Sequence, residues 1–151
     1  MSKFRFKMQS VLDIQVRREE AAQAELAARE RQRAAEQERL DTLSRRRAEA
    51  EQLARAGSVG PASAASLKNA ARRLEAIACH IHDQRNKLQA AETKKEESRR
   101  RLVEIGQRRQ MYETLREHAA EEHHLNERHA DTSAMDEIAA RRGAARAAKR
   151  S

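Results

Sequence analysis

The second half of the chain carries apolar residues at alternating three- and four-residue steps. One set recurs every seven residues from residue 67, and a second set fills the intervening seam position: Leu67, Leu74, Ile81, Leu88, Lys95 and Leu102, then Ala70, Ile77, Gln84, Ala91, Ser98 and Ile105. This heptad pattern is typical of a helix that packs along one seam against another helix. We therefore expect a long helix from about residue 64 to about residue 142.

The first half shows the same pattern with more polar interruptions. Leu12, Leu26 and Leu40 are spaced by two heptads, and other seam positions hold Ala22, Leu43 and Ala50, while polar residues intrude at Arg33, Glu36 and Arg47 as Lys95 does in the second half. Polar seam residues fix the register of a coiled coil at a cost in stability. We expect a helix over about residues 5–56 in a marginally stable coiled coil, with its start between Lys3 and Ser10 and with Ser10 and Asp13 as a candidate capping box.

A single cluster of helix-breaking residues separates the two halves. Residues 57–63 contain Gly57, Gly60 and Pro61, the only proline of the chain. Proline removes a backbone donor and glycine adopts dihedrals that other residues avoid, so this segment predicts a sharp reversal. The predicted fold is all-α, a single domain over residues 1–151 in which two long helices form an antiparallel coiled-coil hairpin, and we expect the isolated chain to be a monomer.

The two predicted helices differ in length, so the hairpin is expected to have one unpaired end. Folding at the turn sets Leu53 opposite Leu67 and Leu40 near Ile81. The N-terminal end of the first helix, near Met8, then lies opposite Tyr112. From Glu113 onward the second helix has no partner in the first helix. A capping-box pattern at Ser133–Asp136 makes a break in the second helix near residues 131–133 an alternative. Gly143 is the expected end of this helix, before a basic tail over residues 143–151.

Composition and charge favour a binding protein over an enzyme. Charged residues make up 37% and aromatic residues 2% of the 151 residues, too few aromatics for an ordinary globular core. Residues 1–18 hold five bases and one acid (+4), and residues 139–151 hold five bases and no acid (+5), so most of the net charge of +8 lies at the two ends. A hairpin brings both ends together, which indicates an acidic partner, nucleic acid or anionic lipid there.

No motif of this chain indicates catalysis, and no cofactor is expected. His118 and Glu122 share a helix face within a cluster that also holds His123, His124, His129, Glu121 and Glu127, so a divalent metal is conceivable there, although a solvated face is the favoured interpretation. In Cys79-His80-Ile81-His82, successive helical residues point in different directions, which argues against a metal site. The basic tail lacks aromatic residues to stack on bases, so no specific nucleic acid is expected.

The two ends of the chain carry distinctive motifs. The N-terminus reads Lys3-Phe4-Arg5-Phe6-Lys7-Met8-Gln9-Ser10-Val11-Leu12-Asp13, and the C-terminal motif reads Met135-Asp136-Glu137-Ile138-Ala139-Ala140-Arg141-Arg142. These two motifs resemble the ends of the FliJ family of bacterial flagellar export proteins. The resemblance implies a component of the flagellar type III export apparatus that docks into the hexameric export ATPase. By motif position, the ATPase-facing residues would be Phe4, Phe6, Val11, Leu12, Asp136, Glu137, Ile138 and Arg141.

The same resemblance implies further partners and a location. It predicts contacts with the cytoplasmic domain of the export gate and with export chaperones, and a cytoplasmic protein that reaches the inner membrane only through the export apparatus. A lone Cys79, no apolar run of membrane-spanning length and no apolar signal core fit that location. An injectisome stalk protein and a basic coiled coil that binds nucleic acid or a scaffold are the alternatives.

Overall fold

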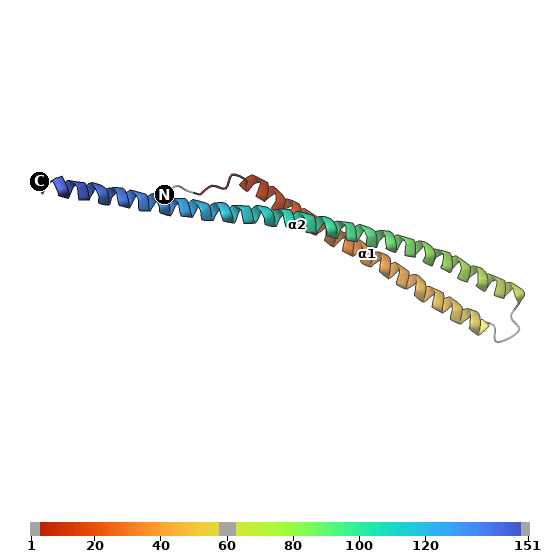
Figure 1. Ribbon diagram of the computed structural model, residues 1–151. Helices are drawn as coiled ribbons and strands as arrows, with labels where there is room; N and C mark the ends of the chain where they lie inside the picture. The colour runs from red at the N-terminus through yellow and green to blue at the C-terminus, as the bar shows by residue number, and fades with distance from the viewer. Residues whose placement is uncertain (1–3, 58–62, 149–151) are drawn as a thin grey trace. The chain divides into compact units, whose positions relative to one another are not determined.

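The computed structural model of this chain describes residues 4–57 and 63–148 and contains two helices (Figure 1). Helix α1 spans Gln9–Gly57 and helix α2 spans Ala64–Ala148. The described residues include no strand, and the two helices pack against each other, so the predicted all-α helical hairpin is confirmed. Most of the predicted turn, including Pro61, lies outside the described residues. Across both described ranges, neither helix has a stretch long and apolar enough to cross a membrane.

Helix α1 begins at Gln9, within the predicted range of residues 3–10, but without the predicted capping box. The carbonyl of Met8 accepts hydrogen bonds from the backbone N–H groups of Val11 and Leu12, both at 3.0 Å. Ser10 lies inside the first turn, and the carboxylate of Asp13 accepts a bond from the Gln9 side chain at 2.8 Å. Residues 4–8 precede the helix, and Phe4 and Phe6 in this segment are half-buried.

Helix α2 begins as predicted but continues past its predicted stop. Ser63 caps the helix, since its hydroxyl accepts a bond from the N–H of Ser66 at 3.2 Å. The helix then runs without a break at Ser133 and through Gly143 to Ala148, so the predicted break near residues 131–133 and the predicted end at residue 142 are wrong. A single glycine in a helix costs only about 1 kcal/mol, which the flanking alanine and arginine residues offset.

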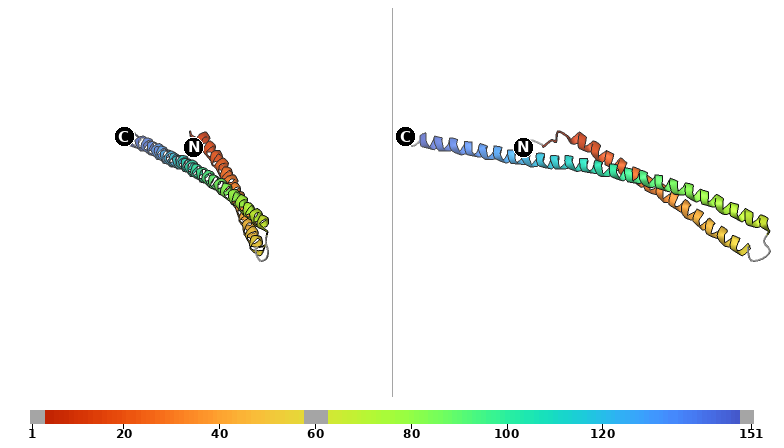
Figure 2. Two further views of the ribbon diagram at one scale, coloured as in Figure 1. Left: turned by 90° about the vertical axis from the view of Figure 1, so that its right-hand side faces the viewer. Right: turned by 45° about the vertical axis from the view of Figure 1, so that its right-hand side comes forward.

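The chain divides into two compact units, residues 1–19 with 105–151 and residues 20–104. In the second unit, the contacts between the helices run in opposite orders along the chain. Arg101 pairs with Glu25 at 3.2 Å, Glu92 with Arg33 at 2.9 Å, and Gln84 with Glu36 at 2.5 Å. As the α1 number rises the α2 number falls, so the helices are antiparallel, and both views of Figure 2 show these parts alongside each other.

The predicted seam of α2 is the face that the structure buries. Ile81, Gln84, Ala91 and Ser98 are buried. The other heptad positions from residue 70 to residue 105 are half-buried: Ala70, Leu74, Ile77, Leu88, Lys95, Leu102 and Ile105. On α1, Ala22 is buried, and Leu26, Arg33, Glu36, Leu40, Leu43 and Ala50 are half-buried, whereas Arg47 is exposed and pairs with Glu51. The heptad pattern therefore identified the packing face correctly.

The two leucines predicted to pair beside the turn line an open groove. Leu53 is 71% exposed and Leu67 is 50% exposed, so these two leucines do not form a buried layer. They line a groove between the helices together with Ala50, Ala54, Ala70 and Ile77. Small alanine side chains occupy the inward positions of α1 here, and they give too little apolar surface to hold the helices tightly together.

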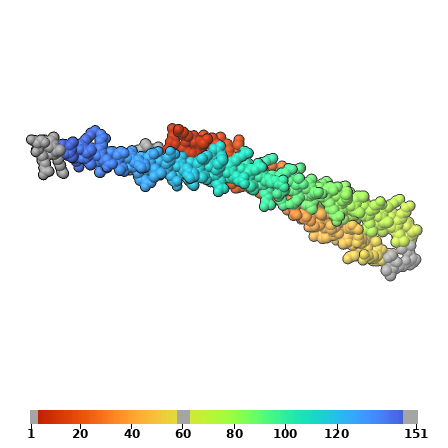
Figure 3. Space-filling model, in the orientation of Figure 1, coloured from red at the N-terminus to blue at the C-terminus, as the bar shows by residue number. Residues whose placement is uncertain are grey.

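In the first unit, the segment before α1 and the start of α1 lie along α2 (Figure 3). Glu19 forms an ion pair with Arg109, and the ring of Phe4 contacts the ring of His123. Paired residues therefore reach well beyond Glu113, where the overhang was predicted to start, because residues 4–8 continue the contact in non-helical form. Residues 128–145 are exposed throughout, and we call them the exposed stretch of α2.

Candidate functional site

The N-terminal predicted site residues form a surface on α2. Phe4 and Phe6 are half-buried, and with Arg5 and Lys7 they line a groove whose other wall is Arg116, Glu117 and Ala120 of α2. Apolar rings alternate with bases here, so the groove offers both an apolar contact and positive charge. The rings have part of their surface free for a partner.

The next two predicted site residues point inward. Leu12 is 3% exposed and Val11 is half-buried. A buried leucine stabilises the packing of its own unit, so Leu12 is not available to a partner in this arrangement. The sequence motif therefore mixes surface residues with core residues, and its Phe4 and Phe6 are the accessible ones.

The C-terminal predicted site residues all lie on the exposed stretch of α2. Arg141 donates a hydrogen bond to the carboxylate of Glu137 at 2.5 Å, while Asp136 is exposed and Ile138 is 46% exposed. Met135, 68% exposed, was not among the predicted residues, although it stands in the same motif. Together they give an apolar patch bordered by both charge signs, on a helix face with no partner among the described residues.

The structure does not bring the two predicted sets into one compact patch. Phe4 contacts His123, and Ile138 follows fifteen residues later on the same helix. At the rise of an α-helix this is about 22 Å. A partner that used both sets would have to lie along α2 rather than fill a pocket.

A charged group beside this region was missed from the sequence. Arg109 contacts Glu113 at 2.6 Å and also pairs with Glu19 of α1. Hydrogen bonds from Arg109 to Glu113, and then to Glu19, raise the pKa of the guanidinium, so it stays charged. Gly106 lies next to the Glu19 carboxylate and has no side chain of its own. The position of this glycine beside the seam is the sequence feature that could have indicated the charged group.

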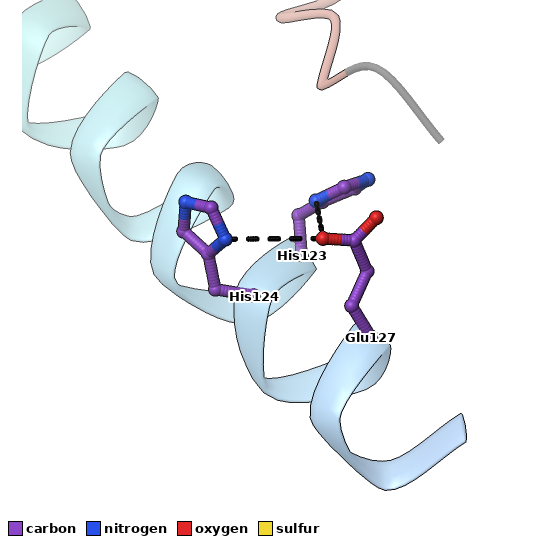
Figure 4. Close-up of side chains that lie close together, drawn as sticks. All are labelled: His123, His124 and Glu127. Atoms are coloured by element: carbon purple, nitrogen blue, oxygen red, sulfur yellow. Dashed lines mark ion pairs between the residues drawn. The ribbon is translucent and has the colours of Figure 1, made fainter. Parts of the chain in front are cut away.

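The histidine-rich region forms a different cluster from the pair singled out in the sequence. The Nδ1 atoms of His123 and His124 lie 3.7 Å and 3.9 Å from the same carboxylate oxygen of Glu127 (Figure 4). His118 instead approaches Glu121, at 3.9 Å, and both side chains are exposed. Among the described residues, His123, His124 and Glu127 are the group whose donor atoms could hold a metal ion.

Comparison with protein families decides what kind of protein carries this arrangement. The family model for the flagellar FliJ protein matches residues 4–148, nearly the whole chain. The chain belongs to the FliJ family. Neither the curated proteins nor the solved structures that were searched give a significant match.

Membership of the FliJ family makes this chain a coiled-coil protein related to flagellar export. The resemblance seen at the two ends is thereby confirmed over the length of the chain. The matched range includes both the Phe4–Leu12 motif and the Asp136–Arg141 motif. The flagellar family match favours the flagellar interpretation over the injectisome alternative.

Proposed function

We propose that this FliJ-family chain docks into the ring of the hexameric flagellar export ATPase and assists the export of flagellar proteins. The docking surface consists of the exposed stretch of α2 and the aromatic N-terminal segment, residues 4–8. The ring performs the ATP hydrolysis. The coiled coil contributes contact energy that differs between the conformations of the ring subunits and so shifts their populations.

The observation that carries the proposal is that every residue from 128 to 145 is exposed, in a helix that bears Met135 and Ile138. Isolated helices are marginal in water, and tertiary packing supplies most helical stability in proteins. A long helical segment whose residues are all exposed among the described part of the chain therefore fits a partner. Met135 and Ile138 supply apolar anchors, and Asp136, Glu137 and Arg141 supply polar contacts around them.

The remaining partners are proposed by resemblance to the same family. The chain would contact the cytoplasmic domain of the export gate and export chaperones, and would associate with the inner membrane only through these proteins. The apolar groove beside the turn, with Leu53 and Leu67, is a surface distinct from the docking surface. Two separate surfaces would allow the chain to contact the ATPase and a second component at once.

Titration of the purified chain into the export ATPase, with ATP hydrolysis as the readout, tests the proposal. An Ile138→Asp variant should need at least about tenfold more protein for half-maximal stimulation, since burying such a side chain is worth about 1.5–3 kcal/mol. Leu125→Asp is the matched control, because Leu125 is 48% exposed and points about 140° away around the helix.

Circular dichroism should show equal helicity in both variants, because both positions are exposed. Equal stimulation by the Ile138→Asp variant and the unmodified chain would contradict the proposal. If Arg141→Ala left stimulation unchanged but removed affinity for nucleic acid, the nucleic-acid alternative would be favoured.

A further inference from the structure

Two histidine side chains of α2 lie around the carboxylate of Glu127, with His123 half-buried and His124 69% exposed. His123 and Glu127 are four residues apart and therefore share a helix face, and His124 reaches the same carboxylate from the next position. Figure 4 shows both imidazole rings turned toward the Glu127 carboxylate. We call His123, His124 and Glu127 the His–Glu cluster.

The distances in this cluster are close to those that a metal ion requires. Two ligands of a tetrahedral Zn²⁺, each about 2.0–2.1 Å from the ion, lie roughly 3.3 Å apart. The two Nδ1–Oε2 distances are 3.7 Å and 3.9 Å, and all three donor atoms lie within 4.8 Å of one another. Small rotations of the side chains would therefore give three ligands to one ion, with the fourth position open to water.

The surroundings distinguish this cluster from an ordinary solvated helix face. The side chains of His123 and Glu127 are only 24% and 31% exposed, although most of their neighbours on α2 are exposed. The ring of Phe4 packs edge-on against His123, with centroids 5.6 Å apart. One carboxylate oxygen of Glu127, Oε1, is buried and accepts no hydrogen bond. The packing limits the rotation of His123, and the carboxylate retains an unused acceptor.

We propose that the His–Glu cluster binds a divalent transition metal ion such as Zn²⁺, and that the bound ion holds the N-terminal segment on α2. Two imidazole nitrogens and one carboxylate oxygen are a donor set that suits Zn²⁺, Ni²⁺ or Cu²⁺ rather than Mg²⁺ or Ca²⁺. The ion fixes the ring of His123, and that ring is the surface against which Phe4 packs. Metal binding thus stabilises the position of an aromatic residue of the N-terminal segment.

Competition with a zinc-sensitive dye tests the metal site on the full chain without an affinity tag. All variants carry Cys79→Ser, since Cys79 is an exposed cysteine and thiolates are zinc ligands that would compete with the cluster. The chain should bind one Zn²⁺, and His123→Ala or Glu127→Gln should each weaken the affinity at least about tenfold. His118→Ala is the matched control, since His118 lies on the same helix, also beside a glutamate, and should keep the affinity unchanged.

Hydrogen exchange with and without Zn²⁺ tests the link to the N-terminal segment. Zinc should slow exchange at the start of the chain, residues 4–12, in the Cys79→Ser chain but not in its Glu127→Gln derivative. Glu127→Gln preserves the shape of the side chain, so a failure to fold does not obscure the result. Absence of one-to-one zinc binding, or equal loss of affinity in the His118→Ala control, would overturn the metal site. Zinc binding without slower exchange would overturn the link to Phe4.

Discussion

The side-chain amide of Gln84 on α2 donates to two acceptors of Glu36 on α1, the backbone carbonyl at 3.0 Å and the carboxylate at 2.5 Å. Gln84 is buried, so both bonds are shielded from much of the solvent. A shift of one helix along the other would leave this buried amide without its acceptors, which costs free energy. The pair therefore specifies the register of the helices in the unit of residues 20–104.

The first prediction concerns the acid sensitivity that this pair creates. The hydrogen bond from Gln84, together with nearby Arg39, lowers the pKa of Glu36 below its ordinary value of 4.5, and bonds from Lys95 and Arg33 lower the pKa of Glu92 in the same way. A depressed pKa in the folded state gives stability that is present above the unfolded value and lost as pH falls through the folded value. The melting temperature should therefore decrease as the pH is lowered below about 4.5.

Gln84→Ala separates this contribution from those of other carboxylates. The variant should melt at a lower temperature than the unmodified chain at pH 7 and should lose less on acidification, because Glu36 then titrates closer to its ordinary pKa. Thermal melts followed by circular dichroism at pH 7 and pH 3 provide the measurement. An identical acid-induced drop in both proteins would contradict the role assigned to Gln84.

The second prediction uses two leucines of the same helix. Leu12 is 3% exposed and Leu53 is 71% exposed. Leu12→Ala should lower the free energy of unfolding by about 2–4 kcal/mol, through lost burial and the cavity left behind. Leu53→Ala should change it by less than about 0.5 kcal/mol. Urea denaturation of both variants measures the difference, and equal effects would show that the exposed leucine is buried in solution, for example in a dimer.

The third prediction concerns local stability along α2. Amides of residues 128–145 should exchange with solvent much faster than those of residues 84–105, because all side chains of the exposed stretch are exposed while the other segment is packed along the seam. Hydrogen exchange followed by mass spectrometry gives this comparison directly. Equal protection of the two segments in the isolated chain would require a partner for the exposed stretch, such as a second copy of the chain.

The repeating part of the fold could be predicted from the sequence because heptad periodicity depends on helix geometry alone. Ile81, Gln84, Ala91 and Ser98 were placed on the seam, and they are buried. The same periodicity fails at Leu67, since it shows which face a residue is on but not where the helices separate. Helix ends were less predictable, because one glycine at residue 143 is too weak a signal to stop an alanine-rich helix.

The candidate site was only partly predictable. Ile138 and Arg141 were identified through a family resemblance, and their exposure follows from the greater length of α2. The contact of Phe4 with His123 could not be predicted, because it depends on a non-helical segment that no periodic pattern describes. Consequently the sequence singled out His118 with Glu122, whereas the structure brings His123 and His124 to Glu127.

Site-specific photocrosslinking to the export ATPase tests the central claim most directly. A photoreactive amino acid at residue 138 places the probe on the exposed stretch of α2. The same amino acid at residue 53 places it beside the turn, at a residue that is more exposed to solvent than residue 138. The account predicts a crosslink to the ATPase from position 138 and none from position 53. A crosslink from position 53 without one from position 138 would contradict it.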